Sequence, residues 1–350
     1  MTSICWLLIA ALACASEELP PVPKGFPSPT VPADNQLTVE KARLGRYLFY
    51  DRRMSVTGTT SCATCHRQEL AFTDGRGQAI GATGERLQRG SMSLVNVAWN
   101  TAFQWRDPTV HTLEEQALKP MMATKPVELG YVFIEKYFLA MARTDRVYSM
   151  LFPKAFPGES DPWTTINVVK AIASFERTII SRGSPWDRFH FEGKQDAIPE
   201  AAKRGEVLFF LDRGPSCFRC HRGYNFSGTA APGAGMTPSS PYHNTGLFVR
   251  YPEADRGLIE FTGRAEDNGR FVAPTLRNVT LTAPYMHDGS VATLGEALDR
   301  YSGGGRGNPY QDSLVHGFRM TPGNKADLIA FLESLTDPDV VHRRELADPF

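Results

Sequence analysis

The sequence predicts a mostly α-helical protein of two similar domains packed together, with long loops and little β-structure. The pentapeptide Cys62-Ala63-Thr64-Cys65-His66 returns, with the same cysteines and histidine, as Cys217-Phe218-Arg219-Cys220-His221. Apolar residues recur at helical spacing in several segments, whereas strand patterns are sparse. A chain of 350 residues is also long enough for two domains, each with its own core.

The repeated pentapeptide is the attachment motif of a c-type haem, in which two thiols bond the porphyrin edge and the imidazole binds iron. A chain with 6 Cys and 8 His among 350 residues would contain it by chance only about 0.002 times. A zinc site built from both cysteine pairs would leave both histidines unexplained. The sequence therefore predicts two cytochrome c-like domains and two covalently bound haem c groups. The haems are expected on Cys62 and Cys65 and on Cys217 and Cys220, with His66 and His221 as iron ligands.

Residues 1–15 are predicted to be a secretory signal peptide. Residues 4–13 form an uncharged apolar run too short to span a bilayer, followed by the small-residue cleavage site Ala13-Cys14-Ala15. No Lys or Arg precedes the run, and cleavage before Cys14, giving a lipid-anchored protein, is the alternative. Both readings predict a periplasmic or otherwise exported protein. Residues 16–34 are predicted to be a Pro-rich linker without helix.

The segments before the two haem motifs indicate an internal duplication. A helix capped by Thr38 is expected to contain residues 45–50, Gly-Arg-Tyr-Leu-Phe-Tyr, shortly before the first motif. Residues 205–210, Gly-Glu-Val-Leu-Phe-Phe, precede the second motif in the same way. The predicted division is an N-terminal haem domain at 35–190, a C-terminal haem domain at 191–340 and a tail at 341–350.

Two further helices and one loop complete the predicted organisation. Residues 166–180 carry apolar side chains at helical spacing and are expected to form core. Thr321-Pro322 starts a terminal helix that is expected to cross the haem-bearing one. Residues 227–246 are rich in Gly, Pro, Ser and Thr and are predicted to form a long loop over the second haem. The apolar stripe of the terminal helix consists of Leu328, Phe331, Leu332 and Leu335.

The charge balance argues against a general nucleic-acid or membrane-surface binder. Lys+Arg and Asp+Glu number 38 each, so the formal net charge is zero. Without an excess of either sign, no long-range field favours a polyanionic partner. Recognition is therefore expected to depend on particular sites.

Several segments beyond the haem motifs resemble the bacterial dihaem cytochrome c peroxidase and MauG family. The resemblance runs from about residue 36 to 337, nearly the whole expected mature chain. Residues 91–100 look most like a MauG-like branch that includes the dihaem oxidase of methanobactin operons. The other matching segments are 62–74, 114–130, 274–279 and 284–289.

The resemblance implies that the first haem reacts with peroxide. No histidine lies between His66 and His111, which favours a five-coordinate iron whose sixth position is open. Glu128 matches the family's distal acid, which moves a proton between the peroxide oxygens. Pro120 matches the residue packed over the open iron face. Met92 is the weaker alternative, a ligand that would block this face.

The second haem is expected to be six-coordinate. The column that holds the family's sixth ligand is Tyr301 here, where ordinary peroxidases have methionine and MauG has tyrosine. A phenolate stabilises high-valent iron, whereas a thioether raises the potential and favours electron entry. Met286 and Met320 are the rival ligands.

The resemblance also assigns groups between the haems. Trp105 matches a tryptophan that relays an electron or a hole, with Trp99 as the alternative. The family's calcium ion would take carbonyls of Thr282 and Pro284, although Gly90 stands in the column of its asparagine and Asn96 lies further along. Arg277 could pair with a haem propionate, and His287 and Asp288 are interpreted as structural. The remaining histidines are assigned ordinary roles: His111, His190, His243, His316 and His342.

Three functions follow from these expectations. The first is an exported dihaem oxidoreductase that uses hydrogen peroxide to form a high-valent dihaem state and modifies a Trp or Tyr residue of a small exported partner protein. The second is a cytochrome c peroxidase that takes electrons from a small cytochrome c or cupredoxin. The third is an electron-transfer cytochrome without peroxide chemistry. Tyr301 discriminates the first from the second, and Glu128 with an open first haem discriminates both from the third.

Overall fold

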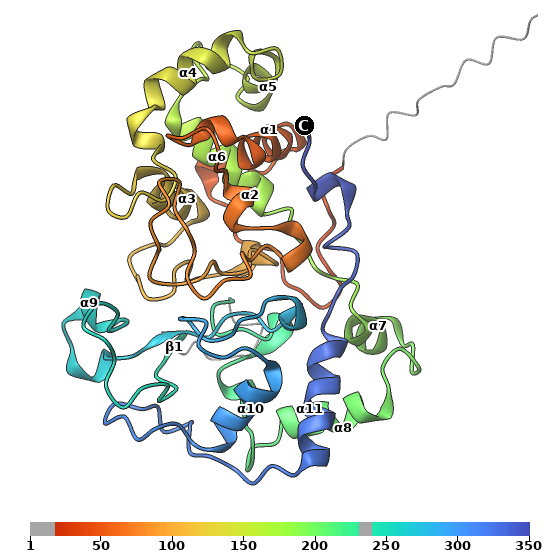
Figure 1. Cartoon of the computed structure of the whole chain (residues 1–350). Coiled ribbons are helices and arrows are strands. Elements are labelled where there is room, and N and C mark those ends of the chain that lie inside the picture. Colours follow the sequence, from red (N-terminus) through yellow and green to blue (C-terminus); the bar gives the residue numbers. More distant parts are fainter. Residues whose placement is uncertain (1–17, 231–239) are drawn as a thin grey trace, which may run out of the picture.

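The computed structural model describes residues 18–230 and 240–350 and shows two helical lobes, one above the other (Figure 1). The predicted signal peptide and Cys14 lie outside the described residues. The mostly α-helical class is confirmed, since the described strands are only β1 (Tyr242–His243) and β2 (Phe271–Val272), an antiparallel pair. The N-terminal lobe holds α1 (Val39–Tyr50), α2 (Cys62–Cys65), α3 (Leu113–Met122), α4 (Glu135–Thr144), α5 (Tyr148–Ala155) and α6 (Thr165–Glu176). The C-terminal lobe holds α7 (Pro185–Glu192), α8 (Glu200–Phe209), α9 (Ile259–Thr262), α10 (Leu294–Ser302) and α11 (Pro322–Ser334).

The N-terminal lobe is organised by the crossing of α1 and α6. The Thr38 side chain accepts a hydrogen bond from the backbone N–H of Lys41 and caps α1, as predicted. Gly45 lies where the helices touch, and a Cβ there would collide with the carbonyl oxygen of Ala171. Phe49 and Phe175 pack beside this contact with ring centroids 5.1 Å apart. A glycine is therefore needed at the crossing.

The C-terminal lobe repeats this crossing with α8 and α11. Gly205 lies against the carbonyl oxygen of Asp327, with which an added Cβ would collide. Phe209 and Phe331 pack with ring centroids 5.0 Å apart. The Thr321 side chain caps α11 by accepting from the N–H of Asn324. The internal duplication is thus confirmed in three dimensions, and each copy crosses its two helices through a glycine.

The duplication extends to a pair of asparagine turns that the sequence comparison did not identify. Asn96 and Asn278 both have left-handed backbones, with φ of 57° and 60°, and each precedes a 3-10 turn. Their N–H groups donate to the carbonyls of Ile179 and Leu335, just beyond α6 and α11. Both asparagines stand in a [Ser/Thr]-Leu-x-Asn-Val pattern, at 93–97 and 275–279, which could have revealed the match.

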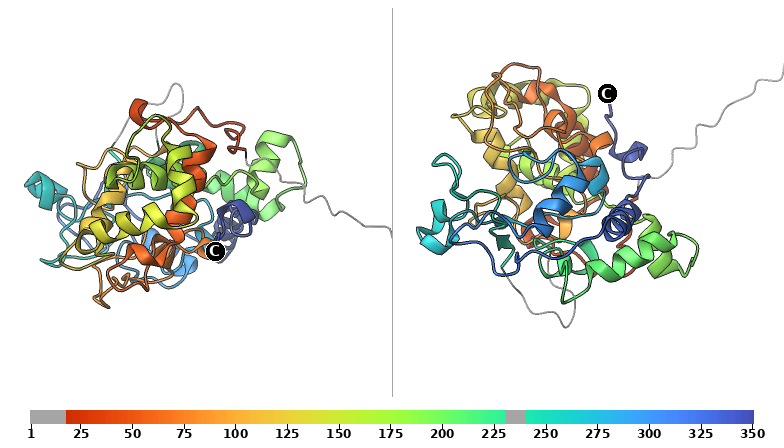
Figure 2. Two further views of the ribbon diagram at one scale, coloured as in Figure 1. Left: turned by 90° about the horizontal axis from the view of Figure 1, so that it is seen from above. Right: turned by 60° about the horizontal axis from the view of Figure 1, so that its bottom comes forward.

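Three segments join the two lobes. The described part of the expected linker contains no helix before residue 33, yet Phe26 is buried against Trp99 and Tyr224. Trp186 of α7 packs into the core of the C-terminal lobe. After α11 the chain returns to the N-terminal lobe, where Leu346 is buried, and Figures 1 and 2 show the C-terminal end beside that lobe.

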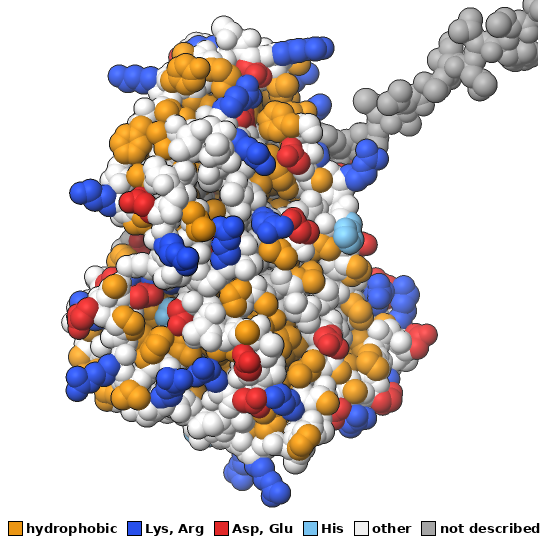
Figure 3. Space-filling view, in the orientation of Figure 1, with side chains coloured by type: hydrophobic (Ala, Val, Ile, Leu, Met, Phe, Trp, Pro, Cys, Tyr) orange, Lys and Arg blue, Asp and Glu red, His pale blue; other side chains and the backbone are white. Residues whose placement is uncertain are grey.

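The surface mixes charges of both signs. Figure 3 shows Lys and Arg interspersed with Asp and Glu over both lobes, as expected from a formal net charge of zero. Among the described residues, no helix is both long enough and apolar enough to cross a bilayer. The visible face thus offers no broad region of one charge.

Candidate haem and peroxide sites

The first haem-attachment site is held by a tight loop after α2. Ala71 and Phe72 adopt left-handed backbones, with φ of 50° and 61°, which turns the chain back toward His66. The Nδ1 of His66 lies 2.9 Å from the carbonyl oxygen of Phe72, so Nδ1–H donates and Nε2 remains available for iron. Burial lowers the pKa of His66 and keeps it neutral, the form that binds a metal.

The second site orients its histidine in the same way but with a distant partner. The Nδ1 of His221 lies 2.9 Å from the carbonyl oxygen of Pro274, which is 53 residues away in the chain. Burial lowers the pKa of His221 to about 4. His221 is thus neutral at ordinary pH and presents Nε2 to the cavity, as a haem ligand must.

The cysteines fit thioether attachment. Burial raises the pKa values of Cys62 and Cys217 to about 12, so both thiols are protonated. All four motif cysteines are unpaired with one another. Within residues 18–230 and 240–350, no three His, Cys, Asp or Glu side chains form a metal cluster. Each lobe therefore holds two thiols and one available imidazole nitrogen, the set that haem c requires.

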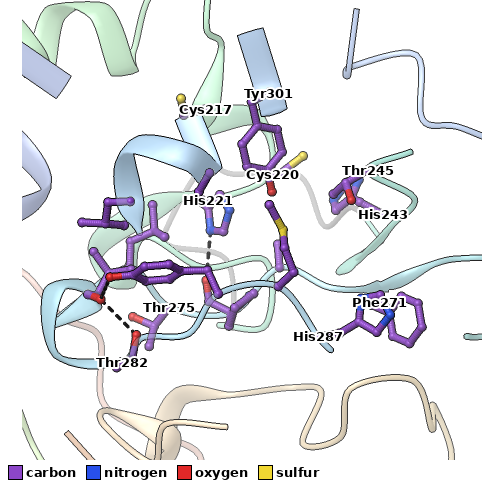
Figure 4. A pocket seen from close by; sticks show the side chains of 18 of the residues that line it. Cys217, Cys220, His221, His243, Thr245, Phe271, Thr275, Thr282, His287 and Tyr301 are labelled. Atoms are coloured by element: carbon purple, nitrogen blue, oxygen red, sulfur yellow. Dashed lines mark hydrogen bonds between the residues drawn. The ribbon is translucent and has the colours of Figure 1, made fainter. Parts of the chain in front are cut away.

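A large cavity surrounds the second site (Figure 4). Cys217, Cys220 and His221 line it together with Tyr301 of α10, whose hydroxyl points into the cavity. Burial raises the pKa of Tyr301 well above its usual value, so an isolated phenol would stay protonated there. Deprotonation needs a strong Lewis acid at the hydroxyl, and a ferric iron would provide it. The arrangement fits the predicted His221/Tyr301 ligand pair.

The rival ligands occupy different places. Met286 lines the same cavity as Tyr301, while Met320 packs against the core of the C-terminal lobe. Met92 has its backbone beside the imidazole of His66, and its side chain packs against the same apolar cluster as Trp105. Because Met92 approaches from the side of the proximal histidine, this position disfavours it as a ligand on the opposite face of the first haem.

Glu128 lies close to the first attachment site. Its charge acts on the thiol of Cys65, and its backbone carbonyl accepts from the N–H of Ala82 at 2.7 Å. The next residue, Leu129, donates its N–H to the carbonyl of Pro120, which brings the two predicted distal residues together. Burial raises the pKa of Glu128, and the charge of Arg89 partly opposes this rise.

Trp105 lies between residues of the two lobes. Its indole Nε1 donates to the carbonyl of Gly90 at 3.0 Å, and its carbonyl accepts from the N–H of Val272 in β2. It also lines the cavity that contains Tyr301. Trp99, the alternative, is buried against Phe26 and is not among the residues that line this cavity. The role of Trp105 as a relay between two haems stays a prediction.

The residues of the expected calcium site line the wall of this same cavity. Thr282, Pro284 and Gly90 all contribute to it, but the Gly90 carbonyl already accepts the Trp105 indole N–H. Asp74 adds an oxygen that the sequence did not suggest, since its Oδ2 is buried and has no hydrogen-bond partner within the described chain. Calcium takes six to eight oxygen ligands. Its binding here stays a prediction.

Arg277 has a different role from the one expected. Its guanidinium is fully buried and pairs with both oxygens of Asp187 at 2.8 and 2.9 Å. It also donates to the carbonyl of Tyr224 and packs over the rings of Phe26 and Trp186. The residue thus ties α7 to the rest of the C-terminal lobe, and the predicted pairing with a haem propionate is wrong.

The comparisons with known proteins point to one family. A model of the di-haem cytochrome c peroxidase family matches residues 39–196. MauG of Methylorubrum extorquens is 34% identical over 313 residues, which cover 89% of this chain and 82% of that protein. The cytochrome c551 peroxidase of Nitrosomonas europaea is 31% identical, over 83% of this chain and 78% of that protein. A solved structure of a MauG-like protein associated with microbial copper homeostasis has a TM-score of 0.89 and 38% identity, covering 94% of this chain and 98% of that one.

The chain therefore belongs to the dihaem cytochrome c peroxidase and MauG family. Members of this family are haem-dependent oxidoreductases, and the family implies two haem cofactors and hydrogen peroxide as a reactant. The predicted family and enzyme class are confirmed. Relatives carry both the MauG and the peroxidase names, so the family alone leaves the electron source open.

Proposed function

We propose that this protein is an exported MauG-like oxidase with two covalently bound haem c groups. Peroxide reacts at the His66 site, and the oxidising equivalents leave from the His221/Tyr301 site to oxidise a Trp or Tyr residue of a partner protein. The observation that carries the proposal is the hydroxyl of Tyr301 in the cavity that His221 lines. When bound, the haems supply the one-electron chemistry that the side chains lack.

Glu128 performs the proton transfer in this proposal. Its carboxylate accepts a proton from the inner oxygen of peroxide and returns it to the outer oxygen, which then leaves as water. Burial supports this role, because it raises the pKa of Glu128 and makes the carboxylate a stronger base. Pro120, whose carbonyl accepts from the N–H of Leu129, has no side-chain atom that could bind iron.

Trp105 connects the two sites. Its indole lines the cavity of the second site, while its hydrogen bond to Gly90 fixes the ring in the N-terminal lobe. An electron can therefore pass toward the first site through a ring held between the lobes. Tyr301 favours the storage of oxidising charge because a phenolate donates electron density to iron.

The partner is proposed to be a small exported protein that is oxidised at tryptophan. Support comes from the resemblance of residues 91–100 to the methanobactin-operon branch and from the 38% identity to a MauG-like protein associated with microbial copper homeostasis. Export is proposed from residues 1–15, with a lipid anchor at Cys14 as the alternative. The partner would be consumed as a substrate rather than act as an electron donor.

The second candidate function is cytochrome c peroxidase activity with a small cytochrome c or cupredoxin as donor. It is favoured by relatives named as peroxidases at 31% identity, such as that of Nitrosomonas europaea. In that case the second haem would admit electrons, a task for which a thioether ligand such as Met286 is better suited than Tyr301.

One experiment separates the two functions. Peroxide is added to the haem-loaded protein without any donor, and the near-infrared spectrum is followed for a long-lived charge-resonance band shared by both haems. We expect the band in the wild type and in the exposed control Tyr137→Phe, and its loss in Tyr301→Phe. Absence of the band together with fast turnover on reduced cytochrome c would contradict the oxidase and support the peroxidase.

A further inference from the structure

His243 is a buried imidazole in the wall of the second cavity. It belongs to β1, pairs with Phe271 of β2 and is only 9% exposed. Figure 4 places it with Thr245 at one side of the cavity, whereas Tyr301 and His221 lie nearer the middle. The sequence assigned His243 an ordinary surface or core role, and its place in this wall is seen only in the structure.

A carboxylate holds the imidazole in place. The Nδ1 of His243 lies 2.7 Å from Oδ2 of Asp312. Asp312 is itself fixed, because its Oδ1 accepts from the N–H of Leu314 and its own N–H donates to the carbonyl of Asn244. The hydrogen bond from His243 is also the largest cause that lowers the pKa of Asp312, which is therefore ionised.

The other ring nitrogen of His243 is left for a group inside the cavity. Nε2 is buried and makes no hydrogen bond to any described residue. A buried polar atom of this kind needs a partner, because burial removes the water that would otherwise satisfy it. With Asp312 accepting at Nδ1, the charged form of the ring would present Nε2–H to an anion in the cavity.

A haem bound at Cys217 and Cys220 would bring two such anions, its propionates. Arg277, the partner expected from the sequence, is already committed to Asp187. His287, another imidazole in this wall, stacks on Phe271 at 3.7 Å, and burial lowers its pKa to about 4, so it is neutral. His316 is exposed at the cavity edge.

We propose that His243, held by Asp312, donates a hydrogen bond from Nε2 to a propionate of the second haem and thereby raises the reduction potential of the Tyr301 site. The inference rests on the proposed function, because it requires a haem on Cys217 and Cys220. A donor at the propionate withdraws negative charge from the porphyrin edge and so disfavours the ferric state. His243 is thus a positioning residue, acting through the haem carboxylate.

The test uses the full-length, haem-loaded protein and three variants. His243→Leu removes the donor, His243→Gln keeps an N–H donor near the position of Nε2, and Asp312→Asn removes the charge behind the ring. The exposed His342→Leu is the matched control. We expect a lower potential of the second haem in His243→Leu, a smaller decrease in Asp312→Asn, partial recovery in His243→Gln and no change in the control.

A second readout reports the hydrogen bond itself. The propionate bending mode in the resonance Raman spectrum should shift in His243→Leu and return toward the wild-type frequency in His243→Gln. An unchanged potential and an unchanged bending mode in His243→Leu would overturn the inference. A change confined to the phenolate-to-iron absorption would also overturn it, because it would place Nε2 on Tyr301.

Failure of the proposed function gives a different result. Haem content and protein mass are measured first on the wild type. One haem per chain, or a second haem without the tyrosinate spectrum, would contradict the proposed function before any variant is compared. Two haems and a tyrosinate spectrum, with His243→Leu like the wild type, would contradict only the role of His243.

Discussion

The His66 and His221 sites are built on the same helix crossing, yet they are completed differently. Phe72, six residues after His66, supplies the carbonyl that orients the first imidazole, whereas Pro274 supplies it to His221 from 53 residues away. The backbone of Met92 also lies beside His66, and that of Phe226 beside His221. Each imidazole therefore has one neighbour in its own loop and one just before an asparagine turn, and the two sites differ in which of these carbonyls accepts the shorter hydrogen bond.

The two copies also differ in the second helix of each crossing, α6 in the N-terminal lobe and α11 in the C-terminal lobe. Phe175 and Phe331 take equivalent places, so the next residues, Glu176 and Leu332, are equivalent too. Leu332 lines the second cavity. Glu176 is 4% exposed, its Oε2 has no hydrogen-bond partner among the described residues, and its charge acts on Cys62. A polar group thus stands in the first site where the second is apolar.

Among the expected effects, the largest is the loss of peroxide reactivity when Glu128 of the first site is replaced. Glu128→Gln keeps the shape but removes the base, and we expect the second-order rate of reaction with peroxide to fall about 10²- to 10³-fold. Stopped-flow absorption at the Soret band measures the rate. Glu40→Gln, on the exposed first turn of α1, is the control. A variant that reacts within about twofold of the wild type would remove Glu128 from the distal chemistry.

Glu176 should make the stability of the N-terminal lobe depend on pH. Burial raises its pKa to about 8, above the ordinary value of 4.5, so the folded state holds a proton that the unfolded state releases. Stability then falls as pH rises from 5 to 8, by on the order of 3 kcal/mol. Glu176→Leu, which copies Leu332, should lack this loss in chemical denaturation. Parallel pH curves for variant and wild type would show that Glu176 is not protonated.

Substitution of the glycine at the helix crossing should destabilise both lobes equally. In Gly45→Ala the new methyl would collide with the Ala171 carbonyl, and in Gly205→Ala with that of Asp327. We expect each to lower the free energy of unfolding by about 2 kcal/mol, after the gain in helix propensity is subtracted. Gly323→Ala, where the nearest atom is 3.8 Å from the added Cβ, is the helical control. A loss in only one lobe would contradict the equivalence.

The smallest expected effect is a displacement of the pH profile of the peroxide reaction. The base form of Glu128 is needed, so the rate should fall as pH drops below its raised pKa, and this acid limb should be absent in Glu128→Gln. The charge of Arg89 lowers that pKa, so Arg89→Gln should move the limb upward by less than about one pH unit. A limb unmoved in Arg89→Gln would assign the titration to another group.

Local sequence patterns predicted much of the fold and the residues of the two haem motifs. The haem motifs, the capped helices after Thr38 and Thr321, and the duplication marked by Gly45 and Gly205 all depend on residues close in the chain. Such signals survive in sequence because helix periodicity, capping and the C-x-x-C-H spacing are local requirements. The placement of Tyr301 came from resemblance, and the structure puts its hydroxyl in the cavity.

Contacts between distant residues were decided only by the tertiary structure. Arg277 pairs with Asp187, which is 90 residues away in the chain, and His243 pairs with Asp312, which is 69 residues away. Neither pairing has a spacing signature, because a buried charge takes whichever opposite group the packed chain brings within hydrogen-bond distance. The sequence by itself therefore determined where the two haem motifs lie. The folded lobes determined which side chains surround them, and so what distinguishes the two sites.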